Sequence, residues 1–345
     1  ERKPVESSFS AIHHTIQLKP VLAKRFYDDQ GSQQWFDLSI VPLSEIDNVS
    51  VEEPKSGSVG QFLFVLNDTN ESQKRIQESC QKISTTPNEW INVIGCPTKH
   101  NKLNDYAEEL SVLEHMWNEF PELSNDSVAR REIEYQSELI ESMLQEEFQK
   151  VFAETIWFES GHKSKPIRDT HDLSIAASKL ISHQLTQSPI IKNELVNRTK
   201  PSGSAISAIK KLLKQMVLFE GDERLLIKGY PAEWGIFQSV LVNNNLYKET
   251  KGHWSFCSPQ KSDKSNLFPA WKASLDHLKK NQKGNLSVAE IYKIWSAPPF
   301  GIKKGLHNIF MVALILSEKQ NIAFYRENIF QSNFSDLDID YLTSD

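Results

Sequence analysis

The chain has few cysteines and no long hydrophobic run, and each absence excludes a class of protein. Cys80, Cys96 and Cys257 are the only cysteines among 345 residues. Three scattered cysteines give neither a disulfide framework nor a zinc site, and they are typical of a reducing compartment. The longest apolar run, Ile309–Leu316, is far too short to cross a bilayer, and the first ten residues lack the apolar core of a signal peptide. We therefore predict a cytoplasmic chain without membrane contact.

The sequence also lacks the short motifs of common catalytic sites. Neither GxGxxG nor GxxxxGK[ST] follows a predicted strand, and HExxH, GxSxG and paired CxxC are missing. The best hydrolytic candidate is Arg168–Asp172 (RDTHD), where His171 lies near two aspartates. Helix capping by aspartate or threonine explains that run better. We therefore predict that this segment is not an enzyme and that it holds no metal or cofactor.

Charge is distributed unevenly along the chain. The net charge is −6, yet residues 105–160 contain 15 acidic and 3 basic side chains, whereas residues 161–330 contain 25 basic and 13 acidic ones. A basic half beside an acidic segment can mark a surface that contacts nucleic acid. Ordinary solvated surfaces produce the same pattern, so both interpretations remain open.

The first third of the chain predicts a small α/β domain over residues 1–120. Its short runs rich in aromatic and β-branched residues are typical of strands, and polar segments between them are compatible with helices. Strand, helix, strand, helix is the order of a parallel βαβ unit. The predicted strands are Phe9–Leu18, which alternates only weakly, Gln34–Val41, Gln61–Leu66 and Trp90–Gly95. The predicted helices are Thr69–Ser84 and Asn101–Trp117.

A helical connector is predicted for residues 121–189. Apolar residues between about Ser127 and Glu154 recur in steps near three, four and seven, which gives one apolar helical face, while the other face is mostly glutamate. A coiled-coil arm or oligomer contact is one interpretation. A helix lying across its own domain is favoured, because the heptad is not kept over three or four repeats. Trp157–Thr170 is predicted to be a linker, followed by a helix at Asp172–Gln187.

The rest of the chain predicts two winged-helix-like modules, at residues 190–258 and 268–345. In the second module, Ser287 and Glu290 have capping-box spacing, and Pro298-Pro299 ends the helix that they begin. The order helix, turn, helix, hairpin is that of a winged helix-turn-helix. The predicted helices are Ile190–Arg198, Ser204–Leu218, Pro231–Val242 and Ile302–Ser317, and the predicted hairpins are Leu246–Cys257 and Ile322–Gln331. The whole fold is therefore predicted to be α+β, with a small N-terminal α/β domain, a long helical connection and tandem winged-helix-like modules.

Several stretches of the chain resemble parts of very large bacterial P-loop ATPases. The stretches are LKPVLAKRFYDDQGSQQWFDLSIV, DSVARREIEYQSELIESMLQEEF, IIKNELVNRTKPSGSAISAIKKLL, GYPAEWGIFQSVLVNNNLY and APPFGIKKGLHNIFMVALILSEKQNIAFYRENIF. Such ATPases occur in phage-defence gene clusters, including BREX-type ones. The resemblance implies a DNA-associated assembly whose ATPase motifs lie outside this segment. It assigns no active-site residue to any position here.

Two functions follow from these patterns. The first is a non-catalytic region of a defence-associated ATPase that binds double-stranded DNA through phosphate contacts, because lysines position a protein on DNA without reading bases. The predicted nucleic-acid contacts are Lys210, Lys211, Lys214, Lys248, Lys251, His253, Lys303, Lys304 and Arg326. The alternative is a scaffold that binds other subunits of the defence complex and does not contact DNA. The segment Lys200–Ala205 (KPSGSA) is a weaker phosphate-binding candidate, since serines there more often cap a helix.

Overall fold

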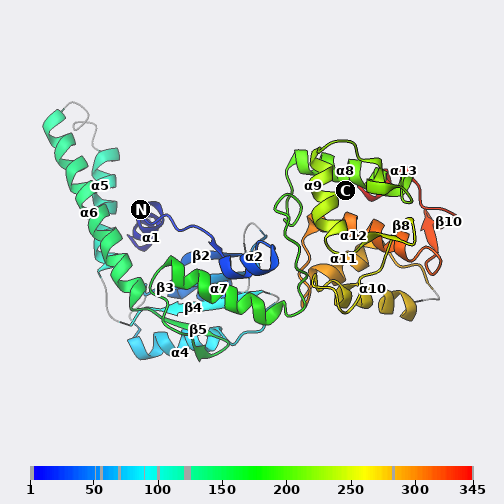
Figure 1. Cartoon of the computed structure of the whole chain (residues 1–345). Coiled ribbons are helices and arrows are strands. Elements are labelled where there is room, and N and C mark those ends of the chain that lie inside the picture. Colours follow the sequence, from blue (N-terminus) through cyan, green and yellow to red (C-terminus); the bar gives the residue numbers. More distant parts are fainter. Residues whose placement is uncertain are drawn as a thin grey trace. The chain divides into compact units, whose positions relative to one another are not determined.

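The computed structural model describes residues 4–343 except 51, 55–56, 69–70, 89, 99–101, 120–125 and 282–283 (Figure 1). The side chains of residues 4–8 and 119 are also outside the description. The chain forms two compact units: Glu1–Ala23 with Gln34–Ser178, and Lys24–Gln33 with Lys179–Asp345. The predicted domain boundary at residues 120–121 lies outside the described residues.

A six-stranded sheet forms the centre of the first unit. Its strands are β1 (Val21–Leu22), β2 (Trp35–Pro42), β3 (Gly60–Leu66), β4 (Ile91–Cys96), β5 (Ile156–Glu159) and β6 (His162–Lys163), paired in that order. The three middle strands are parallel, which confirms the predicted βαβ order, and the other neighbours are antiparallel. The helices are α1 (Pro4–Thr15), α3 (Ile46–Val49), α4 (Gln73–Ile83), α5 (Leu103–Glu119) and α6 (Ser127–Ala153), with a 3₁₀ turn η1 (Leu43–Glu45). Helix α7 (Thr170–Gln184) continues into the second unit.

Both faces of this sheet are covered, which explains why every residue of β3 is buried. On one face Phe64 packs against Phe148 and Phe152 near the end of α6. On the other face Leu63 and Val65 join a cluster with residues of α4. Alternate residues of one strand therefore pack against different helices.

Two segments of the first unit differ from their predicted structure. Trp157–Thr170 was predicted to be a linker, but β5 and β6 occupy its start, because Trp157 and Phe158 are almost completely buried in the sheet. The weakly alternating segment Phe9–Leu18 is mostly helical, as the end of α1. Ala11 and Ile12 are buried on that helix, so a helical period fits the burial better than the predicted alternation.

Helices α5 and α6 form a two-helix arm that extends away from the sheet, with α1 beside its lower part (Figure 1). Helix α6 begins one residue after Asp126, whose carboxylate accepts hydrogen bonds from the backbone N–H groups of Val128 and Ala129. Only its C-terminal part lies on the sheet, through Phe148 and Phe152. The interpretation of α6 as a helix across its own domain therefore applies to that end alone.

The second unit is mainly helical. Its helices are α2 (Lys24–Gln30), α8 (Gly203–Leu218), α9 (Ala232–Ile236), α10 (Phe268–Lys280), α11 (Val288–Ser296), α12 (Lys304–Ser317) and α13 (Asp336–Leu342), with a 3₁₀ turn η4 (Glu223–Leu226) and a π-helical turn η5 (Phe237–Val242). Two hairpins complete it: β7 (Tyr247–Thr250) with β8 (His253–Phe256), and β9 (Phe324–Arg326) with β10 (Ile329–Gln331). Both hairpins turn through two residues with positive φ, as in a type I′ turn.

The two segments predicted as winged-helix-like modules share one hydrophobic core, which extends from Ile191 to Ile339. Apart from the segment Ile190–Arg198, the predicted helices and hairpins are present in the predicted order, while the winged-helix interpretation itself stays a prediction. The predicted helix Ile190–Arg198 is wrong. Asn193 accepts hydrogen bonds there from the backbone N–H groups of Leu195 and Val196, and such local side-chain bonds favour turns over helix.

Helix α12 is buried on nearly all sides, with eleven of its 14 residues inside the core. Its backbone also packs closely at Gly305, whose N–H donates to the carbonyl of Arg198. A Cβ at Gly305 would lie 2.1 Å from the carbonyl oxygen of Val196. None of the helices in the described parts of the chain has the length and hydropathy that a membrane span requires.

Candidate interaction surfaces

Two of the predicted phosphate-binding lysines pair with an aspartate inside their own unit. Lys210 and Lys214 on α8 lie 2.8 and 3.5 Å from a carboxylate oxygen of Asp340 on α13. The hydrogen bond from Lys210 is the main reason that the pKa of Asp340 is lowered. Both lysines are partly exposed, but each would meet phosphate in competition with this carboxylate.

Arg326 and Lys303 are also turned inward. The Arg326 guanidinium donates to Asp338 Oδ1 at 3.2 Å and lies over the ring of Tyr341 at 5.3 Å. Lys303 is 9% exposed just before α12, and burial lowers its pKa to about 8. Neither side chain presents a free cation to a duplex.

The remaining predicted contacts are exposed: Lys211, Lys248, Lys251, His253 and Lys304. The hairpin β7–β8 brings together three of them. Its register pairs Lys248 with Ser255 and Thr250 with His253, so Lys248 and His253 share one face, and Lys251 lies in the turn. On the opposite face, Trp254 stacks on Tyr247, which is buried in the core. Among the nine predicted contact residues, the three on this hairpin are the best placed to contact phosphates.

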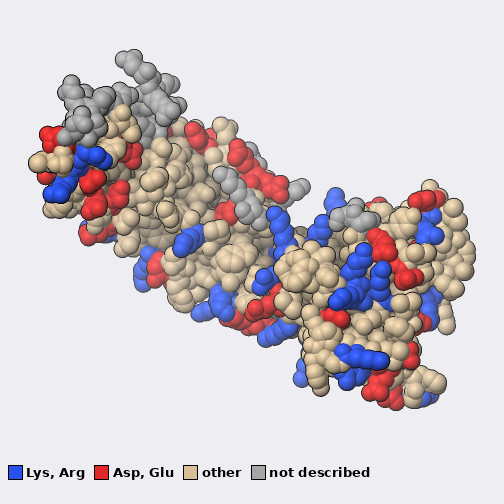
Figure 2. Space-filling model, turned by 90° about the horizontal axis from the view of Figure 1, so that it is seen from above, with Lys and Arg blue, Asp and Glu red and all other residues tan. Residues whose placement is uncertain are grey.

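The second unit does not present a uniformly basic surface in the view of Figure 2, where basic and acidic side chains are interspersed. The first unit shows acidic side chains over its arm, with a few basic ones near the tip. The basic side chains of residues 161–330 therefore do not gather into one patch on this face, because the fold places several of them beside carboxylates.

An exposed apolar surface lies at the C-terminal hairpin, and the sequence analysis missed it. Tyr325, Ile329 and Phe330 are 46, 66 and 58% exposed, and the rings of Tyr325 and Phe330 are 5.8 Å apart across the strands. Leu337 and Tyr341, at i and i+4 on α13, are 61 and 59% exposed. We name these five residues the hairpin patch, although the strand register places Tyr325 and Phe330 on one face of the hairpin and Ile329 on the other. Alternation of side chains along the segment predicted the two strands but could not show that neither face of this hairpin is well covered.

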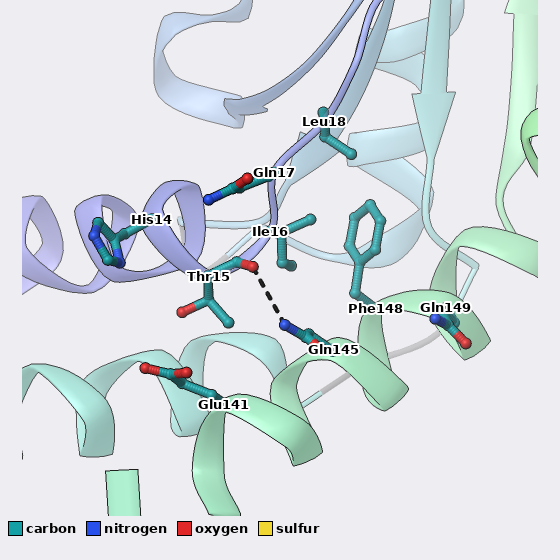
Figure 3. Close-up of a pocket in the computed structure, with 9 residues that line it drawn as sticks. All are labelled: His14, Thr15, Ile16, Gln17, Leu18, Glu141, Gln145, Phe148 and Gln149. Carbon is teal, nitrogen blue, oxygen red and sulfur yellow. Dashed lines mark hydrogen bonds between the residues drawn. The ribbon is translucent and has the colours of Figure 1, made fainter. Parts of the chain in front are cut away.

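The arm contains a hollow of about 560 Å³ between the end of α1 and α6 (Figure 3). Ile16, Leu18 and Phe148 form its apolar part, and His14 and Glu141 lie on opposite sides. Gln145 Nε2 donates to the carbonyl of Thr15 at 3.5 Å across this hollow. A second hollow, of about 270 Å³, lies between α5 and α6 toward the tip.

The catalytic and phosphate candidates act as helix caps. The backbone N–H of Asp172 donates to Asp169 Oδ1, and that of Arg168 donates to Asp172 Oδ2, so the RDTHD run forms the start of α7. Ser202 Oγ accepts from the backbone N–H of Ala205 at the start of α8. Within the described residues, no group of three or more His, Cys, Asp or Glu is arranged to hold a metal ion. The three cysteines are free thiols.

No protein-family model, no curated protein and no solved structure matches this chain. Its class is therefore defined by its own geometry: an α+β chain with a small mixed sheet, a helical arm and a helical second unit that exposes apolar side chains.

Proposed function

We propose that this chain is a non-catalytic assembly region that binds other proteins of a larger complex. The observation that carries the proposal is the hairpin patch. The hairpin in the wing position exposes Tyr325, Ile329 and Phe330, while its only arginine is bonded to Asp338. In a winged helix, a hairpin that contacts DNA phosphates needs the opposite arrangement, with its basic side chains exposed and its apolar side chains covered. Exposed aromatic clusters are typical of protein interfaces.

The resemblance to large defence-associated ATPases agrees with this proposal, because such an ATPase region would hold subunits together. In that context the partners are the other subunits of a defence complex. The chain itself is proposed to perform no chemistry.

A site-specific crosslinking experiment tests the proposal in cells that express the full protein. A photoreactive amino acid replaces Phe330 in one variant and Lys251 in another. We expect position 330 to crosslink to one protein of discrete mass, and substitution of Tyr325 by Ser to abolish that product. Crosslinking of position 330 to nucleic acid, or to no defined product, would overturn the assembly proposal.

A second candidate is duplex binding through the β7–β8 hairpin. Lys248, Lys251 and His253 favour it, because they lie together at an exposed hairpin and have no ion pair with any described residue. Such contacts would hold a phosphate backbone without reading its sequence.

A further inference from the structure

The hollow near the tip of the arm combines an apolar floor with an acidic rim. Leu113 and Trp117 on α5 and the buried Ile133 on α6 supply its apolar surface. Trp117 is 39% exposed, and the Arg130 guanidinium lies 5.0 Å from its ring centre. This floor is large enough to receive an aliphatic or aromatic side chain from outside.

Four glutamates and no lysine or arginine are among the residues that line this hollow, and Arg130 lies beside it over the Trp117 ring. The glutamates are Glu114, Glu134, Glu138 and Glu141, and the lining is completed by Asn118 and Ser137. Among the described residues, none of these four carboxylates has an ion pair. Their charge is therefore available to a cation from another molecule.

The hollow shown in Figure 3 follows this one along α6 toward the sheet. Glu141 lines both hollows, and the apolar part of the one in Figure 3 is Ile16, Leu18 and Phe148. From Ile133 to Gln149 the groove follows about 24 Å of helix, at 1.5 Å per residue. A partner helix of four to five turns would span it.

We propose that this groove, lined by α5, α6 and the end of α1, is a docking site for a basic amphipathic helix of a protein partner. Apolar side chains at i, i+3 or i+4 and i+7 would enter the floor, and lysines or arginines beside them would face the glutamates. This proposal rests on the proposed assembly function, and it adds to that function the chemistry of one partner.

Charge selects this occupant over a second copy of the chain. Helices α5 and α6 contain eleven acidic and three basic residues. Two such arms would repel each other, whereas a basic helix is attracted. Of the three basic residues, Arg130 lies over the ring of Trp117 one turn before Glu134, Arg131 follows it, and Lys150 lies near the C-terminal end of α6. None of the three lines either hollow.

The test uses the whole chain and a dye-labelled peptide of leucine and lysine, about 18 residues long and patterned as an amphipathic helix. Binding is followed by fluorescence anisotropy. We expect Glu134→Lys combined with Glu138→Lys to weaken binding by about tenfold or more, because like charges then meet across the groove. The matched control is Glu132→Lys combined with Glu146→Lys, an equal charge change at exposed positions of α6 that line neither hollow.

The control pair should weaken binding by less than about threefold, since it changes only the long-range electrostatic potential of the chain, which dissolved salt screens. A peptide of the same composition without the apolar stripe should bind at least about tenfold more weakly than the patterned one. Circular dichroism establishes that both double variants retain their helices.

Equal losses in the two double variants, equal binding of the unpatterned peptide, or no peptide binding would each overturn the groove as a docking site. If sedimentation shows that the native chain forms dimers, and Glu138→Lys changes the dimer fraction, the groove belongs to a second copy of the chain. That result would also overturn the proposal. The crosslinking from position 330 is independent of the arm, so a failed groove and a failed assembly function give different results.

Discussion

Phe310 is 1% exposed on α12, and its ring contacts those of Trp271 and Trp295 edge to face at centroid distances of 6.5 and 6.3 Å. We expect Phe310→Ala to lower the free energy of unfolding by about 3–5 kcal/mol, because it removes buried area and leaves a cavity. Denaturation in urea measures the loss. Phe330→Ala is the control, since that ring is 58% exposed and its removal should change the free energy by less than about 0.5 kcal/mol. A loss below about 1 kcal/mol for Phe310→Ala would contradict a core role.

His307 is 5% exposed beside Phe310, and burial is the main reason that its pKa is lowered to about 4. Its Nε2 lies 3.0 Å from the carbonyl oxygen of Ile302, which can only accept, so Nε2 carries the proton of the neutral ring. In the unfolded chain the same ring titrates near pH 6.5. Between these values the unfolded state binds a proton that the folded state excludes, so stability falls as pH decreases from about 6.5 to about 4.

The whole effect of His307 should be about 3 kcal/mol, complete near pH 4 and absent above about 6.5. Urea denaturation of the native chain and of His307→Gln, at several pH values across this window, measures it. Glutamine does not titrate, so we expect the native chain to lose more stability than the variant as pH falls. Parallel pH profiles for the two proteins would show that His307 is not the group responsible.

Helix α11 begins with a complete capping box, as its sequence predicted. Ser287 Oγ accepts from the backbone N–H of Glu290, and the Glu290 carboxylate accepts from that of Ser287. We expect Ser287→Ala to lower the free energy of unfolding by about 1 kcal/mol, because the backbone N–H of Glu290 loses its partner. Thermal melts measure the change. Ser142→Ala, at an exposed position within α6, is the control and should cost nothing; equal effects would exclude the cap as the cause.

The sequence predicted those helices and strands that have a clear hydrophobic periodicity or capping residues within their own segment. It did not predict elements that form only because a segment distant in the sequence pairs with them. Strands β2 to β4 and helices α6, α8 and α12 follow from apolar runs and periodicity within the segment itself. Strand β5 has only four residues, and it exists because Val93–Cys96 of β4 supply its hydrogen-bonding partners. A segment so short has no readable period, so composition alone suggested a linker.

DNA binding by the whole chain is best tested by a titration with a duplex at several salt concentrations. If the second candidate function holds, log affinity falls with log salt, and Lys251→Ala and Lys248→Ala each flatten the slope by about one unit. Lys214→Ala should flatten it less, because Asp340 already neutralises that cation. If the chain does not bind the duplex at low salt, or if all three variants bind it as tightly as the native chain does, duplex binding through this hairpin is ruled out. The assembly proposal then stands alone.

The sequence by itself determined the α+β class, the parallel βαβ order, the capping box of α11 and the burial of α12, because each follows from patterns within short segments. Only the tertiary structure decided which surface residues are available. Lys214 pairs with an aspartate 126 positions away, and Arg326 is held by Asp338 on a separate helix. Leu113 and Ile133 likewise meet in one groove only because α5 and α6 fold against each other. Ion pairs and grooves of this kind depend on distances in space, which spacing along a chain does not specify.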